Sequence, residues 1–263
     1  MSLIRKYQAN YRKHCIFIKN THAMKAMIFA AGLGTRLKPF TNEHPKALAP
    51  INKRTLLEWN IRYLQQYGID EVIINVHHFA DQIIDTLKEN EGFGSRYAIS
   101  DERAMVLETG GGLKFAHPFF EHEKALLVMN VDILTNLNLH HLIAFHEKKQ
   151  AAATLAITNR SSSRHLLFNE NMQLCAWENT QTKEQKIART ESNLQPFAFS
   201  GIQIIGNELL HNMHHEGKFS IIDEYLYQAQ HHSIVGFDHS GDMLIDVGKP
   251  ESLEKAAQLF PIA

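Results

Sequence analysis

A short apolar run that leads into a glycine-rich turn constrains the fold of this chain more than any other stretch. Residues 27–30 read Met-Ile-Phe-Ala, and Gly32 and Gly34 follow closely. Such a run is typical of a buried strand in a parallel sheet. Glycines after the strand allow a positive φ and a close approach of the main chain to a ligand. The pattern therefore predicts an α/β sheet with a ligand site at the carboxyl end of this strand.

The same turn carries enough positive charge to bind a triphosphate. Arg36 and Lys38 follow the glycines, and Lys46 comes directly after Pro45. Successive N–H groups in such a turn form a concave anion site, and basic side chains neutralise phosphate oxygens. The alternative is an ordinary tight turn with solvated cations, because a Gly-x-Gly pair alone is a weak signal.

Two common phosphate-binding motifs do not fit the spacing. A dinucleotide-binding fingerprint requires a third glycine at position 37, which is Leu37, and no Gly-Lys-Ser/Thr follows as in a P-loop. The longer string GLGTRLKPFT…PKAL, over residues 32–48, resembles the signature GxGTRLxPLT…PKxL of the sugar-phosphate nucleotidyltransferases. Phe40 stands where that family usually has leucine. The resemblance extends from about Met24 to the C-terminus.

This resemblance implies a three-layer, Rossmann-like α/β fold with a mostly parallel central sheet and a small sugar-binding β subregion. The residue pattern agrees, because predicted strands and helices alternate at short intervals. We expect strands at 71–76, 96–100, 124–130, 151–158 and 197–205, and helices at 55–68, 79–90, 138–149 and 220–230. We also expect a hairpin around residues 169–171 and a polar loop at 181–193.

We predict one nucleotidyltransferase domain over residues 24–263. Its nucleotide-binding part covers about 24–160, and its sugar-phosphate-binding part covers about 161–263. Residues 1–23 contain Lys and Arg but no Asp or Glu, and Met24 reads like a natural start before the first strand. We therefore expect residues 1–23 to be a disordered basic extension or the product of an over-long start assignment.

The composition excludes several classes of function. A formal net charge of −1 gives no support for a broad nucleic-acid-binding face. Cys15 and Cys175 belong to no paired motif, so we expect neither a disulfide framework nor a CxxC zinc site, and a cytoplasmic location. No apolar run approaches the roughly 20 residues of a membrane span. We expect a monomer or a small homo-oligomer, and no hexapeptide repeat of the kind that trimerises some relatives is present.

Two aspartates at predicted strand ends are candidate metal ligands. Asp132 follows the strand at 124–130, and Asp246 follows Leu244 and Ile245. Mg²⁺ takes few protein oxygens and completes its shell with phosphate and water. The ordinary alternatives are a solvated aspartate at the first position and an N-cap at the second. The family resemblance favours Mg²⁺ binding by both, although Val131 replaces the glycine that usually precedes the first aspartate.

A second glycine-rich stretch, LETGGG at residues 107–112, is the candidate nucleoside site. Three glycines let backbone groups lie against a flat base or ribose, whereas the alternative is a flexible turn before a helix. Many family members carry LGTAG here. LETGGG resembles instead the uridylyltransferases of the family that act on N-acetylmuramate 1-phosphate in cell-wall recycling. FSGI at residues 199–202 matches the sugar side of the family's cleft.

The resemblance implies Mg²⁺-dependent transfer of a nucleotidyl group from UTP or GTP to a sugar 1-phosphate, with release of pyrophosphate. The sugar phosphate attacks the α-phosphorus directly, so catalysis depends on positioning and charge neutralisation. The expected catalytic residues are Arg36 and Lys46. The other expected contacts are the nucleotide-binding residues Ala30, Ala31, Gly32, Gly34, Thr35, Thr109, Gly110 and Gly111, and the sugar-phosphate-binding residues Asn130, Glu191, Ser200 and Gly201.

Several substrates and one other class of function are compatible with these residues. UTP with N-acetylmuramate 1-phosphate is the first candidate, GTP with mannose or heptose 1-phosphate the second, and CTP with phosphocholine the third. A catalytically silent, nucleotide-sensing subunit is the alternative of another class. Such subunits typically lack a cation of the turn or a metal-binding aspartate, whereas Arg36, Lys46, Asp132 and Asp246 are all present.

Overall fold

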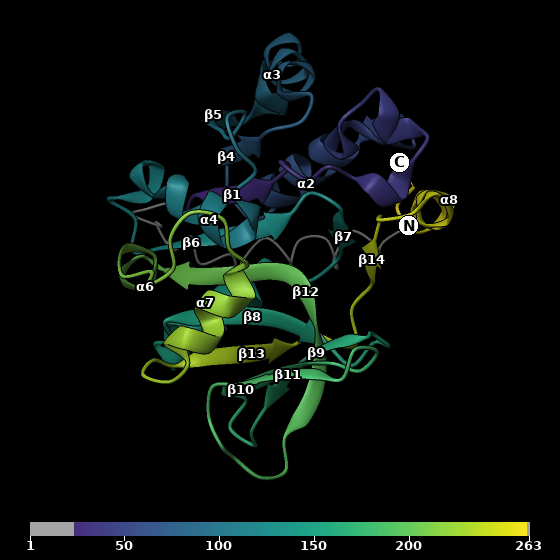
Figure 1. The fold of residues 1–263 in the computed structure, drawn as a ribbon. Coiled ribbons are helices and arrows are strands. Elements are labelled where there is room, and N and C mark those ends of the chain that lie inside the picture. The colour runs from purple at the N-terminus through teal and green to yellow at the C-terminus, as the bar shows by residue number, and fades with distance from the viewer. Residues whose placement is uncertain (1–23, 262–263) are drawn as a thin grey trace, which may run out of the picture.

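Four parallel strands form the half of the central sheet that carries the glycine-rich turn (Figure 1). They are β1 (Ala26–Phe29), β4 (Glu71–Val76), β5 (Arg96–Asp101) and β6 (Ala125–Asn130). The computed structural model describes residues 24–261, so the predicted extension at 1–23 lies outside the described residues. Because parallel strands point the same way, the residues that follow them meet at one edge of the sheet.

Mostly antiparallel strands extend the sheet beyond β6. They are β8 (Ala153–Thr158), β9 (Arg164–Phe168), β10 (Leu174–Asn179), β11 (Glu184–Ile187), β12 (Gln195–Gly206) and β13 (Ile234–Asp238). The strand order is β11-β10-β9-β12-β6-β1-β4-β5, and β8 joins β12 to β13. The ten-stranded sheet is therefore mixed, with parallel pairing among β5, β4, β1 and β6 and between β8 and β13.

Helices cover both faces of the sheet and confirm the expected three layers. They are α2 (Leu56–Gln65), α3 (Ala80–Glu89), α4 (Glu108–Phe115), α5 (Leu139–Lys149), α6 (Asn207–His211), α7 (Ile221–Gln228) and α8 (Pro250–Leu259). Short 3-10 helices lie at Thr35–Leu37, Phe40–Asn42, Lys46–Leu48, Glu91–Gly94 and His117–Phe120. No helix within residues 24–261 combines the length and the apolar character needed to cross a bilayer.

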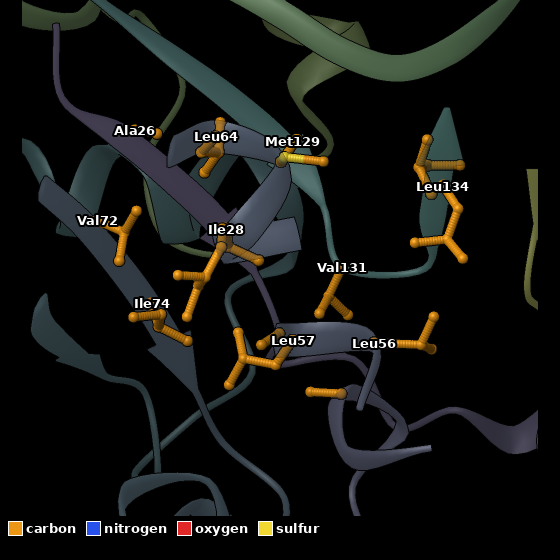
Figure 2. Packing of buried hydrophobic residues seen from close by; sticks show 14 of the residues in the cluster. Ala26, Ile28, Leu56, Leu57, Leu64, Val72, Ile74, Met129, Val131 and Leu134 are labelled. Atoms are coloured by element: carbon orange, nitrogen blue, oxygen red, sulfur yellow. The ribbon is translucent and has the colours of Figure 1, made fainter. Parts of the chain in front are cut away.

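The buried apolar side chains form one cluster on each face of the sheet. Ala26 and Ile28 of β1 belong to the cluster that includes α2, α3, α5 and α8, while Met27 and Phe29 belong to the cluster with α4, α6 and α7. This alternation follows from the two-residue period of a strand. Figure 2 shows the first cluster, in which Ile28 lies among side chains of β4 and α2. Both faces of β1 are thus buried, which fixes the start of the glycine-rich turn.

A short ladder outside the main sheet brings the end of the chain to this edge. β7 (Ile133–Thr135) pairs antiparallel with β14 (Leu244–Asp246), and β2 (Pro50–Ile51) pairs with β3 (Arg54–Thr55). β7 and β14 lie side by side in Figure 1. Asp246 is the last residue of β14, so its expected position at a strand end is confirmed.

The prediction of a polar loop over residues 181–193 is wrong in part. Residues Glu184–Ile187 form β11, which pairs antiparallel with β10 at the edge of the sheet. All four residues of β11 are exposed. A strand that buries neither face has no hydrophobic alternation, so its sequence reads like a loop.

Acidification below about pH 6.5 is expected to lower the free energy of unfolding through His146. This side chain of α5 is buried, and its Nδ1 is 2.9 Å from Thr154 Oγ1. Burial lowers the pKa of His146 below its ordinary value of 6.5. Between the folded and unfolded pKa values the unfolded chain binds the extra proton, so stability falls as pH falls through this window. Urea unfolding at pH 7.5 and 5.5 checks this. If a His146→Gln variant lost as much free energy of unfolding between pH 7.5 and pH 5.5 as the parent protein, the prediction would be contradicted.

Candidate functional site

A cavity of about 510 Å³ opens at the edge of the sheet where β1, β4 and β6 end. Its walls come from the turn after β1, from the start of α4 and from the residues that follow β6. Ten of the expected site residues line it, namely Ala30, Ala31, Gly32, Gly34, Thr35, Arg36, Lys46, Thr109, Asn130 and Asp132. We call this space the nucleotide-side cavity.

The turn after β1 presents free backbone N–H groups at this cavity. Gly34 has a φ of 62°, and a Cβ at this position would lie 2.8 Å from Thr41 Cγ2. The hydroxyl group of Thr41 donates a hydrogen bond to the carbonyl oxygen of Gly34 at 2.9 Å, which fixes the turn. No carbonyl group of residues 24–261 accepts the N–H of Gly32, Leu33 or Gly34. These donors can therefore bind phosphate oxygens.

Asn75 of β4 ties the start of the turn to the buried wall of the cavity. Its Oδ1 accepts the N–H groups of Ala30 at 2.7 Å and Ala31 at 3.3 Å, and its Nδ2 donates to Glu102 Oε1 at 2.7 Å. Asn75 and Glu102 are both buried, and burial raises the pKa of Glu102. Because the N–H groups of Ala30 and Ala31 are occupied, these residues can contact a nucleotide only through their other atoms.

Lys46 and Asp132 form an ion pair at the phosphate end of the cavity. Lys46 is only 9% exposed, and it starts the short helix Lys46–Leu48. Water screens a partly buried pair less than an exposed one, so its charges act strongly on a nearby group. Asp132 thus holds the ammonium group of Lys46 in the wall of the cavity that the turn also lines.

Asp246 reaches the same place from the other end of the chain. The N–H of Val247 donates to the carbonyl oxygen of Asp132 at 2.8 Å. Asp246 Oδ1 is buried and has no hydrogen-bond partner among residues 24–261. Burial raises the pKa of Asp246, the neighbouring Asp132 carboxylate raises it further, and nearby cations oppose both effects. Gly248 lies between Asp246 and Arg36, because a Cβ there would be 2.8 Å from Oδ1 and 3.0 Å from Nη2.

The two aspartates fit a divalent cation that is shared with phosphates. Residues 24–261 contain no group of three or more His, Cys, Asp and Glu side chains that could hold a metal ion alone. Mg²⁺ does not require such a group, since phosphate and water oxygens complete its shell. An unpartnered carboxylate oxygen of Asp246 beside Asp132 is a suitable donor set. These two residues would hold the ion, whose chemistry would be to neutralise phosphate charge.

Gly110 and Gly111 of α4 are packed against a neighbouring segment instead of lining the cavity. A Cβ on Gly111 would lie 2.1 Å from the carbonyl oxygen of Gly217, and a Cβ on Gly110 would lie 2.3 Å from an aromatic ring. The cavity is lined at this end by Glu108 and Thr109. Gly110 and Gly111 therefore have a packing role. Their position gives no support to the prediction that they contact the nucleotide.

A second cavity of about 670 Å³ adjoins the first at Arg36, which lines both. Asp246 lines this second space as well, and the other walls include Arg160, Arg164 and Trp177. Cationic and aromatic side chains suit a ligand that combines a phosphate group with a sugar ring. We call it the sugar-side cavity.

Of the four residues expected on the sugar side, Asn130 alone lines one of the two cavities. Asn130 lines the nucleotide-side cavity, and its Nδ2 is 2.8 Å from the position of a Cβ on Gly201. Gly201 has a φ of 74°, which favours glycine. Ser200 is fully buried, with its Oγ 2.7 Å from His239 Nε2. Glu191 is exposed and lines neither cavity. The structure thus places Asn130 at the site and leaves Ser200 and Glu191 away from it.

Several residues that line the two cavities had no place in the sequence-based site, among them Asn75, Glu102, Arg160 and Trp177. Asn75 and Glu102 follow from a signal that was available, since each is a polar residue at the carboxyl end of a predicted parallel strand. Arg160 and Trp177 carried no such signal. Their positions depend on how β9 and β10 pack beside β12, which local sequence patterns do not specify.

Comparisons with known proteins show the family of the chain. The sequence model of the nucleotidyl transferase family matches residues 25–166. Over 237 residues the chain is 30% identical to the N-acetylmuramate alpha-1-phosphate uridylyltransferase of Neisseria meningitidis, which covers 90% of this chain and 98% of that protein. Over 143 residues it is 36% identical to the UTP–glucose-1-phosphate uridylyltransferase of Synechocystis sp.. That alignment covers 50% of this chain and spans only 36% of the length of the relative.

A solved structure shows the same fold. HddC from Yersinia pseudotuberculosis matches with a TM-score of 0.74, over 90% of this chain and 99% of that chain, at 23% sequence identity. At this identity the likeness concerns the arrangement of strands and helices alone.

Proposed function

Since this chain belongs to the nucleotidyl transferase family, we propose that it joins a nucleoside triphosphate to a sugar 1-phosphate and releases pyrophosphate. One observation carries the proposal. The free N–H groups of the turn, the Lys46–Asp132 pair and Asp246 converge where the two cavities adjoin. The nucleotide-side cavity would take the triphosphate and the sugar-side cavity the sugar phosphate.

The reaction requires no protein nucleophile. A phosphate oxygen of the sugar 1-phosphate forms a bond to the α-phosphorus, the bond from that phosphorus to the bridging oxygen breaks, and pyrophosphate leaves with this oxygen. The N–H groups of Gly32 and Gly34 and the side chain of Arg36 hold the β- and γ-phosphates. Lys46 neutralises the α-phosphate and the incoming phosphate. Asp132 and Asp246 would hold Mg²⁺, which would supply further neutralisation of phosphate charge.

We further propose UTP and N-acetylmuramate 1-phosphate as the substrates. The segment LETGGG and the likeness to the Neisseria enzyme over nearly the whole chain support this choice. Sugar 1-phosphates are anionic, and Arg160 and Arg164 in the sugar-side cavity offer them complementary charge.

GTP with mannose or heptose 1-phosphate is the second candidate, because two acidic residues, Glu102 and Glu108, line the nucleotide-side cavity. Guanine presents adjacent N–H donors on its Watson–Crick edge, which a carboxylate can accept. Measurements of activity with different nucleoside triphosphates therefore decide which base the protein accepts.

The test is pyrophosphate release from UTP, GTP, CTP and ATP, each combined with a panel of acceptors. The panel contains N-acetylmuramate, N-acetylglucosamine, glucose, mannose and heptose 1-phosphates and phosphocholine. We expect the highest kcat/KM for UTP with N-acetylmuramate 1-phosphate. A preference for GTP with mannose or heptose 1-phosphate would select the second candidate. Measurable nucleotide binding without turnover of any pair would favour a nucleotide sensor over an enzyme.

A further inference from the structure

Glu108, the first residue of α4, has a backbone conformation that a side chain rarely adopts. Its φ is +59°, in the left-handed region where a Cβ crowds the following carbonyl group. Glycine adopts this conformation freely. The related segment LGTAG has glycine at the corresponding position. A glutamate at this position therefore has a strained backbone that glycine would not have. Strained residues of this kind concentrate at functional sites.

The contacts of Glu108 within residues 24–261 do not explain its presence. Its carboxylate is 3.5 Å from Lys218 Nζ, and the side chains are 48% and 56% exposed. An exposed ion pair contributes little to stability, so this contact does not offset the strain of the backbone. Glu108 is also one of the residues that line the nucleotide-side cavity. Besides water, a ligand in that cavity is a further partner for its carboxylate oxygens.

The position of Glu108 in the cavity indicates which part of a nucleotide it meets. The phosphate end is marked by the turn after β1 and by Lys46, and the buried wall is formed by Asn75 and Glu102. Glu108 lies on α4, away from the turn, and is half exposed, so it borders the mouth at the nucleoside end. A nucleoside offers two kinds of donor there, the vicinal ribose hydroxyls and the N–H groups of the base.

The ribose is the better partner for a carboxylate. The pairing edge of uracil places a carbonyl oxygen on each side of its single N–H, and both oxygens repel a carboxylate. The two vicinal hydroxyls of ribose are donors, and a carboxylate can accept both. Acidic residues bind ribose hydroxyls in the same way in dinucleotide-binding folds.

We propose that Glu108 is a specificity-determining residue that accepts hydrogen bonds from the ribose hydroxyls and so selects ribonucleotides over 2′-deoxyribonucleotides. This inference rests on the proposed function, because it requires a nucleoside triphosphate in this cavity. The turn, the cations and the two aspartates provide no contact with the ribose of the nucleotide. Glu108 supplies that contact in this proposal.

The decisive variant is Glu108→Gly, which removes the carboxylate and relieves the backbone strain together. Binding of UTP and 2′-deoxy-UTP is measured by calorimetry, and kcat and KM are measured for both. The parent protein should bind UTP about tenfold more tightly than 2′-deoxy-UTP, since a hydrogen bond to a charged group is at stake. The variant should lose this ratio through weaker binding of UTP, while its thermal midpoint rises by roughly 2 °C. A purely structural role would not lower ribonucleotide affinity while raising stability.

Two control variants separate the contributions. Lys183 also has a positive φ, at 63°, and lies in an exposed turn far from the cavity in sequence, so Lys183→Gly should raise the midpoint and leave the ratio unchanged. Lys218→Met removes the ion pair and should change the ratio less than twofold.

An unchanged ratio of UTP to 2′-deoxy-UTP binding in Glu108→Gly would overturn the proposal. Binding of GTP and 2′-deoxy-GTP is measured in the same way. If the affinity lost in Glu108→Gly differed between the two bases but was the same with and without the 2′-hydroxyl, the proposal would also be overturned. Absence of turnover with intact ribonucleotide discrimination would contradict the proposed function alone, because calorimetry does not require chemistry.

Discussion

Asp132→Asn is expected to lower kcat by about two to three orders of magnitude while the protein remains folded. The carboxylate pairs with Lys46 and lies beside Asp246, so its charge orients the ammonium group and completes the proposed Mg²⁺ site. Asparagine has nearly the same shape but no charge. The fold should survive, because the hydrogen bond from Val247 goes to the main-chain oxygen of Asp132, which the substitution keeps.

The measurement is pyrophosphate release under saturating substrates, with circular dichroism and thermal unfolding to confirm folding. A matched control is Asp101→Asn. Asp101 also ends a parallel strand, β5, but it is exposed and pairs with Arg103 outside the cavity. The control should retain its rate within about twofold. If Asp132→Asn turned over at a near-normal rate, the proposed metal site would have to be elsewhere.

Gly111→Ala is expected to reduce the free energy of unfolding by about 3 kcal/mol, the upper part of the usual range for an added methyl group in a packed site. The new Cβ would lie 2.1 Å from the carbonyl oxygen of Gly217 and 3.1 Å from the Cβ of Leu107. The first of these atoms belongs to the backbone and cannot rotate away. The N–H groups of Gly110 and Gly111 also donate to the carbonyl oxygen of Phe219, which holds the facing segment in place.

The effect should extend to nucleotide binding. Glu108 and Thr109 precede Gly111 in the same helix and line the cavity, so a displaced α4 should raise the KM for the nucleotide. Urea unfolding and steady-state kinetics provide the two measurements. Gly241→Ala serves as the control, because Gly241 has no positive φ and a Cβ there meets nothing within 4 Å. A loss below about 1 kcal/mol in Gly111→Ala would show that the facing segment yields easily.

The parts of the site that a sequence can predict are those encoded in contiguous stretches. The strand and turn over residues 26–36 and the strand end at Asp132 depend on local patterns, and the structure brings them together as expected. The three-layer fold follows from the alternation of strands and helices, which the structure confirms.

The remainder depends on packing between distant segments. The glycines of LETGGG read like a ligand-binding turn, but in the structure Gly110 and Gly111 make room for the segment around Gly217. Ser200 belongs to a matching motif and yet is buried against His239. In both cases a small residue satisfies a steric requirement whose origin lies far along the chain, and no local pattern reveals it.

The β7–β14 ladder has a consequence for the order in which activity arises during synthesis. A growing chain on the ribosome can complete the turn after β1, Lys46 and Asp132 long before Asp246 is made. The second carboxylate takes its place only when β14 pairs with β7. Catalytic competence should therefore emerge only after β14 has been made and has paired with β7, when the parallel half of the sheet can already be in place.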